Sequence, residues 1–110
     1  MSREPERTPD GHFVVIDGRR WRATDPAIPE REAAVLRRWL MSARRAVGAA
    51  TRSGDADGES AARARVHAAK TALGERGPAW WEQSDDERRE RRRAGLQQAA
   101  DEGFTPDDGS

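Results

Sequence analysis

The chain has 110 residues, of which 35% are hydrophobic and 36% charged, and its formal net charge is zero. A globular domain usually contains ~45–50% apolar residues, so we expect one thin domain with polar segments outside its core. The absence of cysteine excludes disulfides, thiolate metal sites and cysteine nucleophiles. The longest apolar runs, such as Phe13–Ile16, are far shorter than the ~18 residues of a membrane span. Because the N-terminus also lacks an apolar signal segment, we expect a soluble cytoplasmic protein without membrane contact.

A β-hairpin is predicted just after the N-terminus, where two short runs of residues flank Asp17-Gly18. Asp-Gly favours a type I′ turn, because both central residues of that turn need a positive φ. This turn pairs Val14 with Trp21 and places alternate side chains on one face. An isolated two-stranded hairpin is marginally stable, so this face is expected to dock on another element. The face to be buried carries Val14, Ile16, Trp21 and Ala23.

The first long helix is predicted from Pro29 to about Arg52. Proline suits the first helical turn, and Glu30 and Glu32 suit the positive end of the helix dipole. Apolar residues at helical spacing predict a buried stripe on this helix. That stripe consists of Leu36, Trp39, Leu40, Ala43, Val47 and Ala50. The opposite side carries Arg37, Arg38, Arg44, Arg45 and Arg52, with Arg31 extending the row.

A second helix is predicted from Glu59 to about Arg76, after a loop spanning Ser53–Gly58. Its narrow apolar stripe matches that of the first helix, and a short loop favours antiparallel neighbours. Gly74 and Gly77-Pro78 are expected to end it. The stripe consists of Ala62, Val66, Ala69 and Leu73.

Two adjacent tryptophans follow the second helix. The end of this helix should lie beside the start of the first helix, where the β-hairpin also emerges. We therefore expect one aromatic cluster that closes the core rather than an interface, although an exposed part of it is a possible binding site. Its members are Trp21, Trp39, Trp80 and Trp81.

The C-terminal part is predicted to be a charged helix over residues 83–100, opened by a capping box from Ser84 to Glu87. It contains the run Arg88–Arg93 but no convincing apolar stripe, so we expect a solvated helix. The expected domain is residues 11–82. Disordered segments are expected at residues 1–10 and, as an acidic tail, at residues 101–110.

The predicted fold class is therefore mainly α. It is an antiparallel two-helix hairpin with an N-terminal two-stranded β-hairpin docked at its open end, plus a charged C-terminal helix.

The segments WRATDPAIP (Trp21–Pro29), LMSARRAVGAA (Leu40–Ala50) and ARARVHAAKTALGERGPAWWE (Ala62–Glu82) resemble a family of short uncharacterised actinobacterial proteins. Its members often carry the label "biopolymer transporter Tol". The resemblance covers about residues 11–82, and this chain extends beyond it with Gln83–Ser110. It implies a helical-hairpin unit and brings no activity and no catalytic residues.

No catalytic motif is found. The two histidines, His12 and His67, lie outside any recognised catalytic or metal-binding pattern, and the carboxylates are scattered. We therefore expect a protein that is not an enzyme and uses neither a cofactor nor a metal.

Two binding functions remain. The favoured one is a protein-interaction or scaffold module that binds an unknown protein or a second copy of itself. The alternative is a weak, sequence-tolerant nucleic-acid binder that contacts phosphates through arginines. Zero net charge argues against it, and so does the use of arginine for nineteen of the twenty basic residues, which is typical of GC-rich codon usage. The arginines concerned are Arg20, Arg22, Arg31, Arg37, Arg38, Arg44, Arg45 and Arg52.

Overall fold

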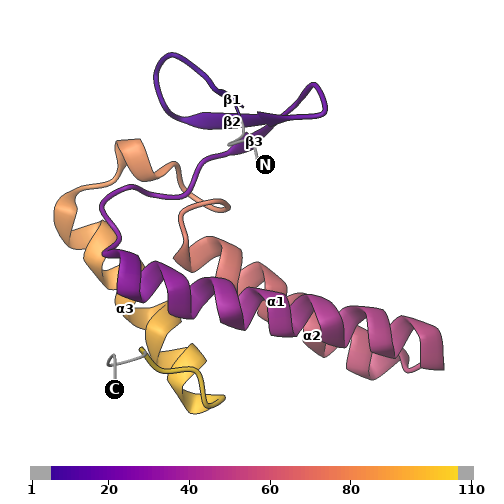
Figure 1. The fold of residues 1–110 in the computed structure, drawn as a ribbon. Helices are drawn as coiled ribbons and strands as arrows, with labels where there is room; N and C mark the ends of the chain where they lie inside the picture. The colour runs from indigo at the N-terminus through magenta and orange to yellow at the C-terminus, as the bar shows by residue number, and fades with distance from the viewer. Residues whose placement is uncertain (1–5, 107–110) are drawn as a thin grey trace.

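The computed structural model describes residues 6–106, which form three α-helices, one 3-10 helix and a three-stranded antiparallel sheet (Figure 1). The prediction of a mainly α protein is confirmed. None of the helices between residues 6 and 106 has the length and apolar composition that a membrane span needs. In chain order the elements are β1 (Glu6–Arg7), β2 (Phe13–Ile16), β3 (Arg19–Arg22), α1 (Glu30–Ser53), α2 (Ala56–Ala72), η1 (Trp80–Glu82) and α3 (Asp85–Asp101).

The β2–β3 hairpin has the predicted turn and register. Asp17 and Gly18 have φ values of 52° and 77°, as a type I′ turn requires, and Val14 pairs with Trp21. The sheet also contains a strand that the sequence did not predict, because β1 pairs with β2 on its other edge. A turn that begins at Thr8 connects these two strands, and the Thr8 N–H donates to the Phe13 carbonyl at 2.9 Å. The prediction of disorder is therefore wrong for residues 6–10, while residues 1–5 lie outside the described part.

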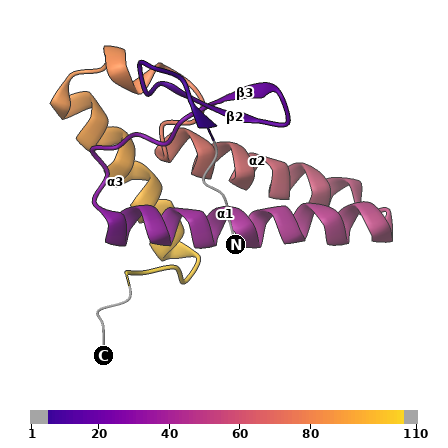
Figure 2. The same ribbon diagram turned by 45° about the horizontal axis from the view of Figure 1, so that its top comes forward.

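Helices α1 and α2 lie side by side along most of their length (Figures 1 and 2). Only Gly54 and Asp55 separate them, so α2 begins three residues earlier than predicted. Gly54 ends α1 with a φ of 71°, and the Asp55 side chain accepts a hydrogen bond from the Gly58 N–H at 2.9 Å. Because Asp55 caps the helix, residues 56–58 of the predicted loop belong to α2.

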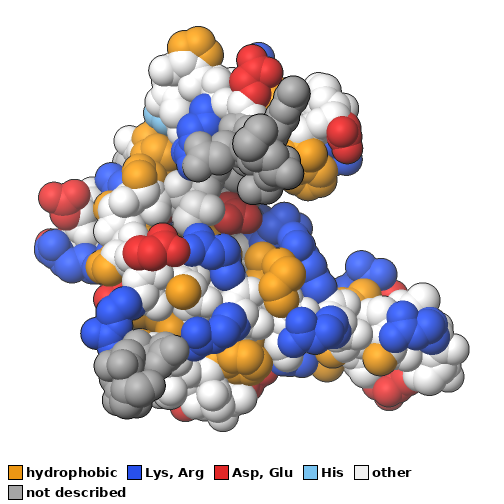
Figure 3. All heavy atoms as spheres, viewed as in Figure 1, with side chains coloured by type: hydrophobic (Ala, Val, Ile, Leu, Met, Phe, Trp, Pro, Cys, Tyr) orange, Lys and Arg blue, Asp and Glu red, His pale blue; other side chains and the backbone are white. Residues whose placement is uncertain are grey.

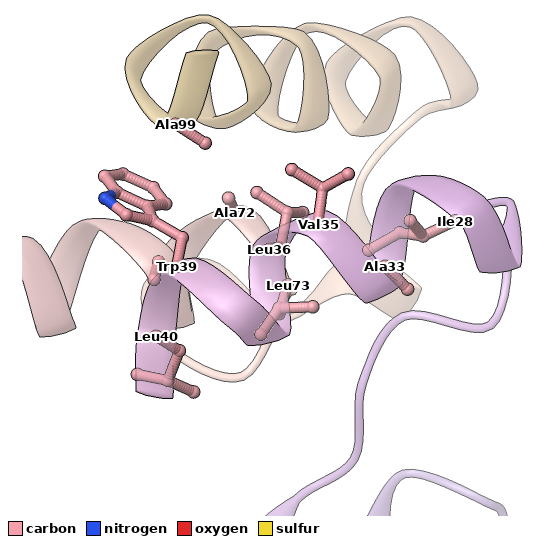
Figure 4. Packing of buried hydrophobic residues seen from close by; sticks show 10 residues of the cluster. Ile28, Ala33, Val35, Leu36, Trp39, Leu40, Ala72, Leu73 and Ala99 are labelled. Atoms are coloured by element: carbon pink, nitrogen blue, oxygen red, sulfur yellow. The ribbon is translucent and has the colours of Figure 1, made fainter. Parts of the chain in front are cut away.

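The hydrophobic core lies where the three helices meet. In Figure 4, Val35, Leu36 and Trp39 lie on the side of α1 that faces α3. Most of the predicted stripe of α1 is buried, and α2 adds Ala69 and Ala72 with Leu73 directly after it. The remaining buried members are Ile28, Ala33, Leu40 and Ala99.

Helix α3 is part of this core, which corrects the prediction of a separate solvated helix. Its capping box from Ser84 to Glu87 is present as predicted. The helix crosses α1 and α2 near the end where α1 begins (Figure 2) and buries Gly95 and Ala99. A Cβ on Gly95 would lie 2.2 Å from the Ala72 Cβ, so the two helices approach very closely. Small residues make this contact, and they produce no apolar stripe in the sequence.

The first residues of the predicted disordered acidic tail are ordered in the structure. Asp101 belongs to α3, and Phe104 packs against the core with its N–H donating to the Ala99 carbonyl at 2.8 Å. The prediction of disorder therefore fails as far as Phe104, and residues 107–110 lie outside the described part.

Candidate binding groove

The sheet stands partly away from the helices, which leaves a groove between them. One end of the sheet is anchored, because Ala23 is buried and its carbonyl accepts a hydrogen bond from the Trp80 indole N–H at 3.0 Å. The other end, near the Asp17-Gly18 turn, projects over the helices. The helices do not fully cover the face of the sheet that points toward them. Trp21 is 39% exposed and Ile16 is 46% exposed. The expected burial of this face is therefore wrong for these two residues.

This opening, here called the sheet–helix groove, has a volume of about 270 Å³. Figure 3 shows the hollow beneath the sheet, with lysine and arginine side chains along it. Apolar side chains come from β2, from β3 and from the residue after β3, cations come from β1, β3, α1 and α2, and Thr24 and Glu75 also line the groove. The apolar residues are Val14, Ile16, Trp21 and Ala23, and the cations are Arg7, Arg22, Arg44 and Lys70.

The groove is electrostatically unbalanced. Its carboxylate, Glu75, accepts a hydrogen bond from the Thr24 hydroxyl at 2.7 Å. Neither Arg44 nor Lys70 forms a salt bridge with any carboxylate among residues 6–106. Burial lowers the pKa of Lys70, the nearby cations Arg76 and Arg44 lower it further, and Glu75 opposes them. The site therefore has excess positive charge that an anion would stabilise.

Trp21 is held in place by cations. The Arg19 guanidinium carbon lies 4.2 Å from the Trp21 ring centroid, and the Lys70 ammonium nitrogen lies 5.4 Å from it. Both distances are within the range of a cation–π interaction. The indole therefore presents a restrained apolar surface rather than a free side chain.

A second hollow continues the groove along α1 and α2. It has a volume of about 320 Å³ and combines the apolar Val47 and Val66 with Arg63 and Arg76. Arg44 lines both hollows, so they adjoin at this side chain. Both hollows thus combine apolar and cationic side chains.

The four tryptophans do not form the single cluster that was expected. Trp39 is 1% exposed in the helical core, whereas Trp21 lies in the sheet–helix groove. Trp80 and Trp81 contact each other, and Trp81 stacks on His12 with ring centroids 3.8 Å apart. The tryptophans are separated because Trp21 lies on the projecting part of β3. Trp80, in contrast, packs at the anchored end of the sheet.

The predicted arginine row is also divided among different environments. Arg37 forms an ion pair with Glu30, and Arg38 donates to the Thr105 carbonyl at 2.7 Å. On the sheet, Arg22 donates to the Gly77 carbonyl at 2.6 Å, and the Arg20 guanidinium lies 5.7 Å from the Phe13 ring centroid. Arg44 lines the groove. The outer side of α1 retains the exposed Arg31, Arg38, Arg45 and Arg52.

Asp25 is a buried charged residue that the sequence reasoning missed. It is 1% exposed and forms ion pairs with Arg88 and Arg91, while its Oδ1 also accepts the Ala27 N–H at 2.8 Å. Burial raises the pKa of the Asp25 carboxyl, but hydrogen bonds from Arg88 and Arg91 lower it more, to about 2. Two features of the sequence could have indicated this pairing: the aspartate before Pro26 and the arginine run of the C-terminal helix. The prediction placed that arginine run in solvent. Asp25 therefore joins the segment that follows the sheet to α3.

The two histidines contact charged or aromatic neighbours. The His67 Nδ1 lies 3.4 Å from an Arg76 nitrogen on the surface, and His12 pairs with Asp10 at 3.3 Å while stacking on Trp81. Among residues 6–106, no three histidine or acidic side chains lie close enough together to hold a metal ion.

Comparisons with known proteins give no match to a protein-family model, to a curated protein or to a solved structure.

Proposed function

We propose that this protein is a non-enzymatic protein-interaction module that binds its partner in the sheet–helix groove. The observation that carries the proposal is the exposure of Trp21 and Ile16 on a sheet face that borders cationic side chains. Tryptophan and arginine are the residues enriched at binding hot spots, and here both line one concave surface. In a chain with few apolar residues, such side chains would otherwise be expected in the core.

The proposal includes the finer fold and setting expected from the sequence. It treats α1 and α2 as a helical hairpin whose open end carries the sheet, with the groove formed by this docking. It also places the protein in the cytoplasm and groups it with the short actinobacterial proteins that it resembles. The proposed function requires no cofactor.

Nucleic-acid binding is the second candidate, favoured by the exposed arginines on the outer side of α1. The ion pair of Arg37 and the hydrogen bond of Arg38 to Thr105 reduce the number of guanidinium groups that can turn toward phosphates. Zero net charge also removes the long-range attraction that such binders use. We therefore favour the protein partner.

Site-specific photo-cross-linking in the native host tests the proposal. A photo-reactive phenylalanine analogue replaces Trp21 in one variant and Arg45, on the outer side of α1, in the matched control. We expect a discrete protein product from position 21 that is absent from position 45. A nucleic-acid product from position 45, or equal products from both positions, would contradict the assignment to the groove.

A further inference from the structure

We infer that the groove recognises an acidic amphipathic segment of a partner protein, in which carboxylates and apolar side chains occur together. This inference rests on the proposed function and names the chemistry of the partner. It follows from the charges, the apolar side chains and the restraint of Trp21 in the groove.

The charges in the groove favour an anionic occupant. Arg7, Arg22, Arg44 and Lys70 line the sheet–helix groove, while Glu75 is its carboxylate. The adjoining hollow adds Arg76 and also Arg63, which already forms an ion pair with Glu59 at 2.9 Å, and its lining contains no acidic residue. Carboxylates placed here would pair with guanidinium groups in the bidentate geometry that arginine favours.

The apolar side chains of the groove favour a partner that carries apolar side chains as well as negative charge. Ile16 and Trp21 are 46% and 39% exposed, and Val47 and Val66 line the second hollow together with Arg44. Burying such side chains contributes roughly 25 cal/mol per Å² of apolar surface removed from water. A purely polyanionic partner would leave this surface in water, whereas an amphipathic segment would cover it.

The restraint of Trp21 distinguishes a peptide from single-stranded nucleic acid. Sequence-tolerant nucleic-acid binders use aromatic faces on which bases stack. The Arg19 guanidinium already lies 4.2 Å from the Trp21 ring centroid and occupies that position over the ring. Aliphatic side chains do not need an open aromatic face, because they pack against the ring edge and against Ile16.

A titration with defined probes tests the inference on the full chain. The probe is a fluorescent peptide of alternating Glu and Leu. Matched peptides replace every Glu by Gln, or every Leu by Ser, and a single-stranded oligothymidine forms a separate arm. We expect the Glu/Leu peptide to bind at least about tenfold more tightly than either matched peptide, with affinity that decreases as salt is added. In NMR spectra the indole N–H signal of Trp21 should shift, while that of the buried Trp39 should not.

Charge reversal then locates the site. Lys70→Glu combined with Arg44→Glu should weaken peptide binding at least about tenfold. The matched control, Arg38→Glu combined with Arg45→Glu, changes the same charge on the outer side of α1 and should bind as the wild type does. If the reversed groove variant fails to fold, Lys70→Gln with Arg44→Gln replaces it and should weaken binding in the same direction.

The inference would be overturned by equal binding of the Glu and Gln peptides, by tighter binding of oligothymidine than of peptide, or by equal losses in the groove and control variants. Absence of peptide binding would also overturn it. If position 21 still cross-links a protein in that case, the proposed function stands and only the acidic chemistry is wrong.

Discussion

Asp25 is the residue at which three distant segments of the chain meet. Its N–H donates to the Leu73 carbonyl at 2.9 Å, which ties the segment after β3 to the end of α2. Its carboxylate binds Arg88 and Arg91 of α3, and the Arg88 Nε–Oδ2 distance is 3.0 Å. The Arg91 side chain is 7% exposed, so removing the carboxylate would leave a buried cation without its partner. Asp25 thus helps to fix the position of α3.

The Asp25→Asn substitution is expected to reduce the free energy of unfolding at neutral pH by about 3–5 kcal/mol, because it leaves Arg88 and Arg91 uncompensated. Urea denaturation measures this effect. The matched control is Asp86→Asn, which removes an exposed ion pair with Arg89 and should change stability by less than about 1 kcal/mol. Equal effects of the two substitutions would show that the buried ion pairs do not stabilise the fold.

The same carboxylate predicts a pH dependence. The folded-state pKa of Asp25 is about 2, below the ~3.9 of an unfolded aspartate. Its stabilising contribution is therefore fully present above about pH 4 and is lost as the pH falls from about 4 toward 2. Unfolding measured across this range should show a loss of stability in the wild type that is smaller in Asp25→Asn. Parallel pH profiles for the two proteins would contradict this assignment.

At the scale of elements, the close approach of α2 and α3 is the contact that places α3. Gly95 lies against Ala72, and the position that a Cβ would occupy is 2.2 Å from the Ala72 Cβ and 3.5 Å from the Leu36 Cδ2. Side chains in packed cores have little room to move aside, so this glycine is required by packing. Gly48 of α1 provides the contrast, because its nearest neighbour is the flexible end of Arg52 at 3.2 Å.

The Gly95→Ala substitution should therefore destabilise the protein by about 1–3 kcal/mol, although alanine is the better helix former. Gly48→Ala should instead be neutral or stabilising by up to ~1 kcal/mol, since helix propensity acts there without a rigid clash. Chemical denaturation of both variants measures the difference. An increase in stability for Gly95→Ala would mean that α3 does not pack as described.

At the scale of the whole molecule, α3 completes the core instead of extending from it. Ala99 is fully buried in the same cluster as Leu36 and Trp39, and Leu96 and Phe104 pack against its edge. Arg92 adds an ion pair with Glu32 of α1 at 2.9 Å. The packed core thus includes residues beyond the predicted domain of residues 11–82.

A chain that ends at Gln83 should lose cooperative thermal unfolding, because the truncation exposes the core beneath α3 and removes both ion-pair partners of Asp25. Near-ultraviolet circular dichroism, which reports on packed tryptophans, measures this loss. A chain that ends at Pro106 keeps every described contact and is the control. A cooperative transition in the shorter chain would instead support the predicted domain of residues 11–82.

Local interactions explain which features were predictable. The Asp17-Gly18 turn, the capping box at Ser84 and the buried stripe of α1 each depend on residues close together in the sequence. Turn geometry, capping and helical spacing act over a few residues, so the pattern is sufficient to predict them. The mainly α class follows from the same short-range signals.

The sequence by itself therefore determined the helical class, the hairpin register and most of the face that α1 buries. Tertiary structure alone decided the packing of α3, the burial of Asp25, the separation of the four tryptophans and the exposure of Trp21 in a cationic groove. The physical reason is that these features depend on contacts between residues such as Asp25 and Arg91, which are far apart in the chain. Small residues and arginines, which carry no apolar pattern, make those contacts, so only their arrangement in space reveals them.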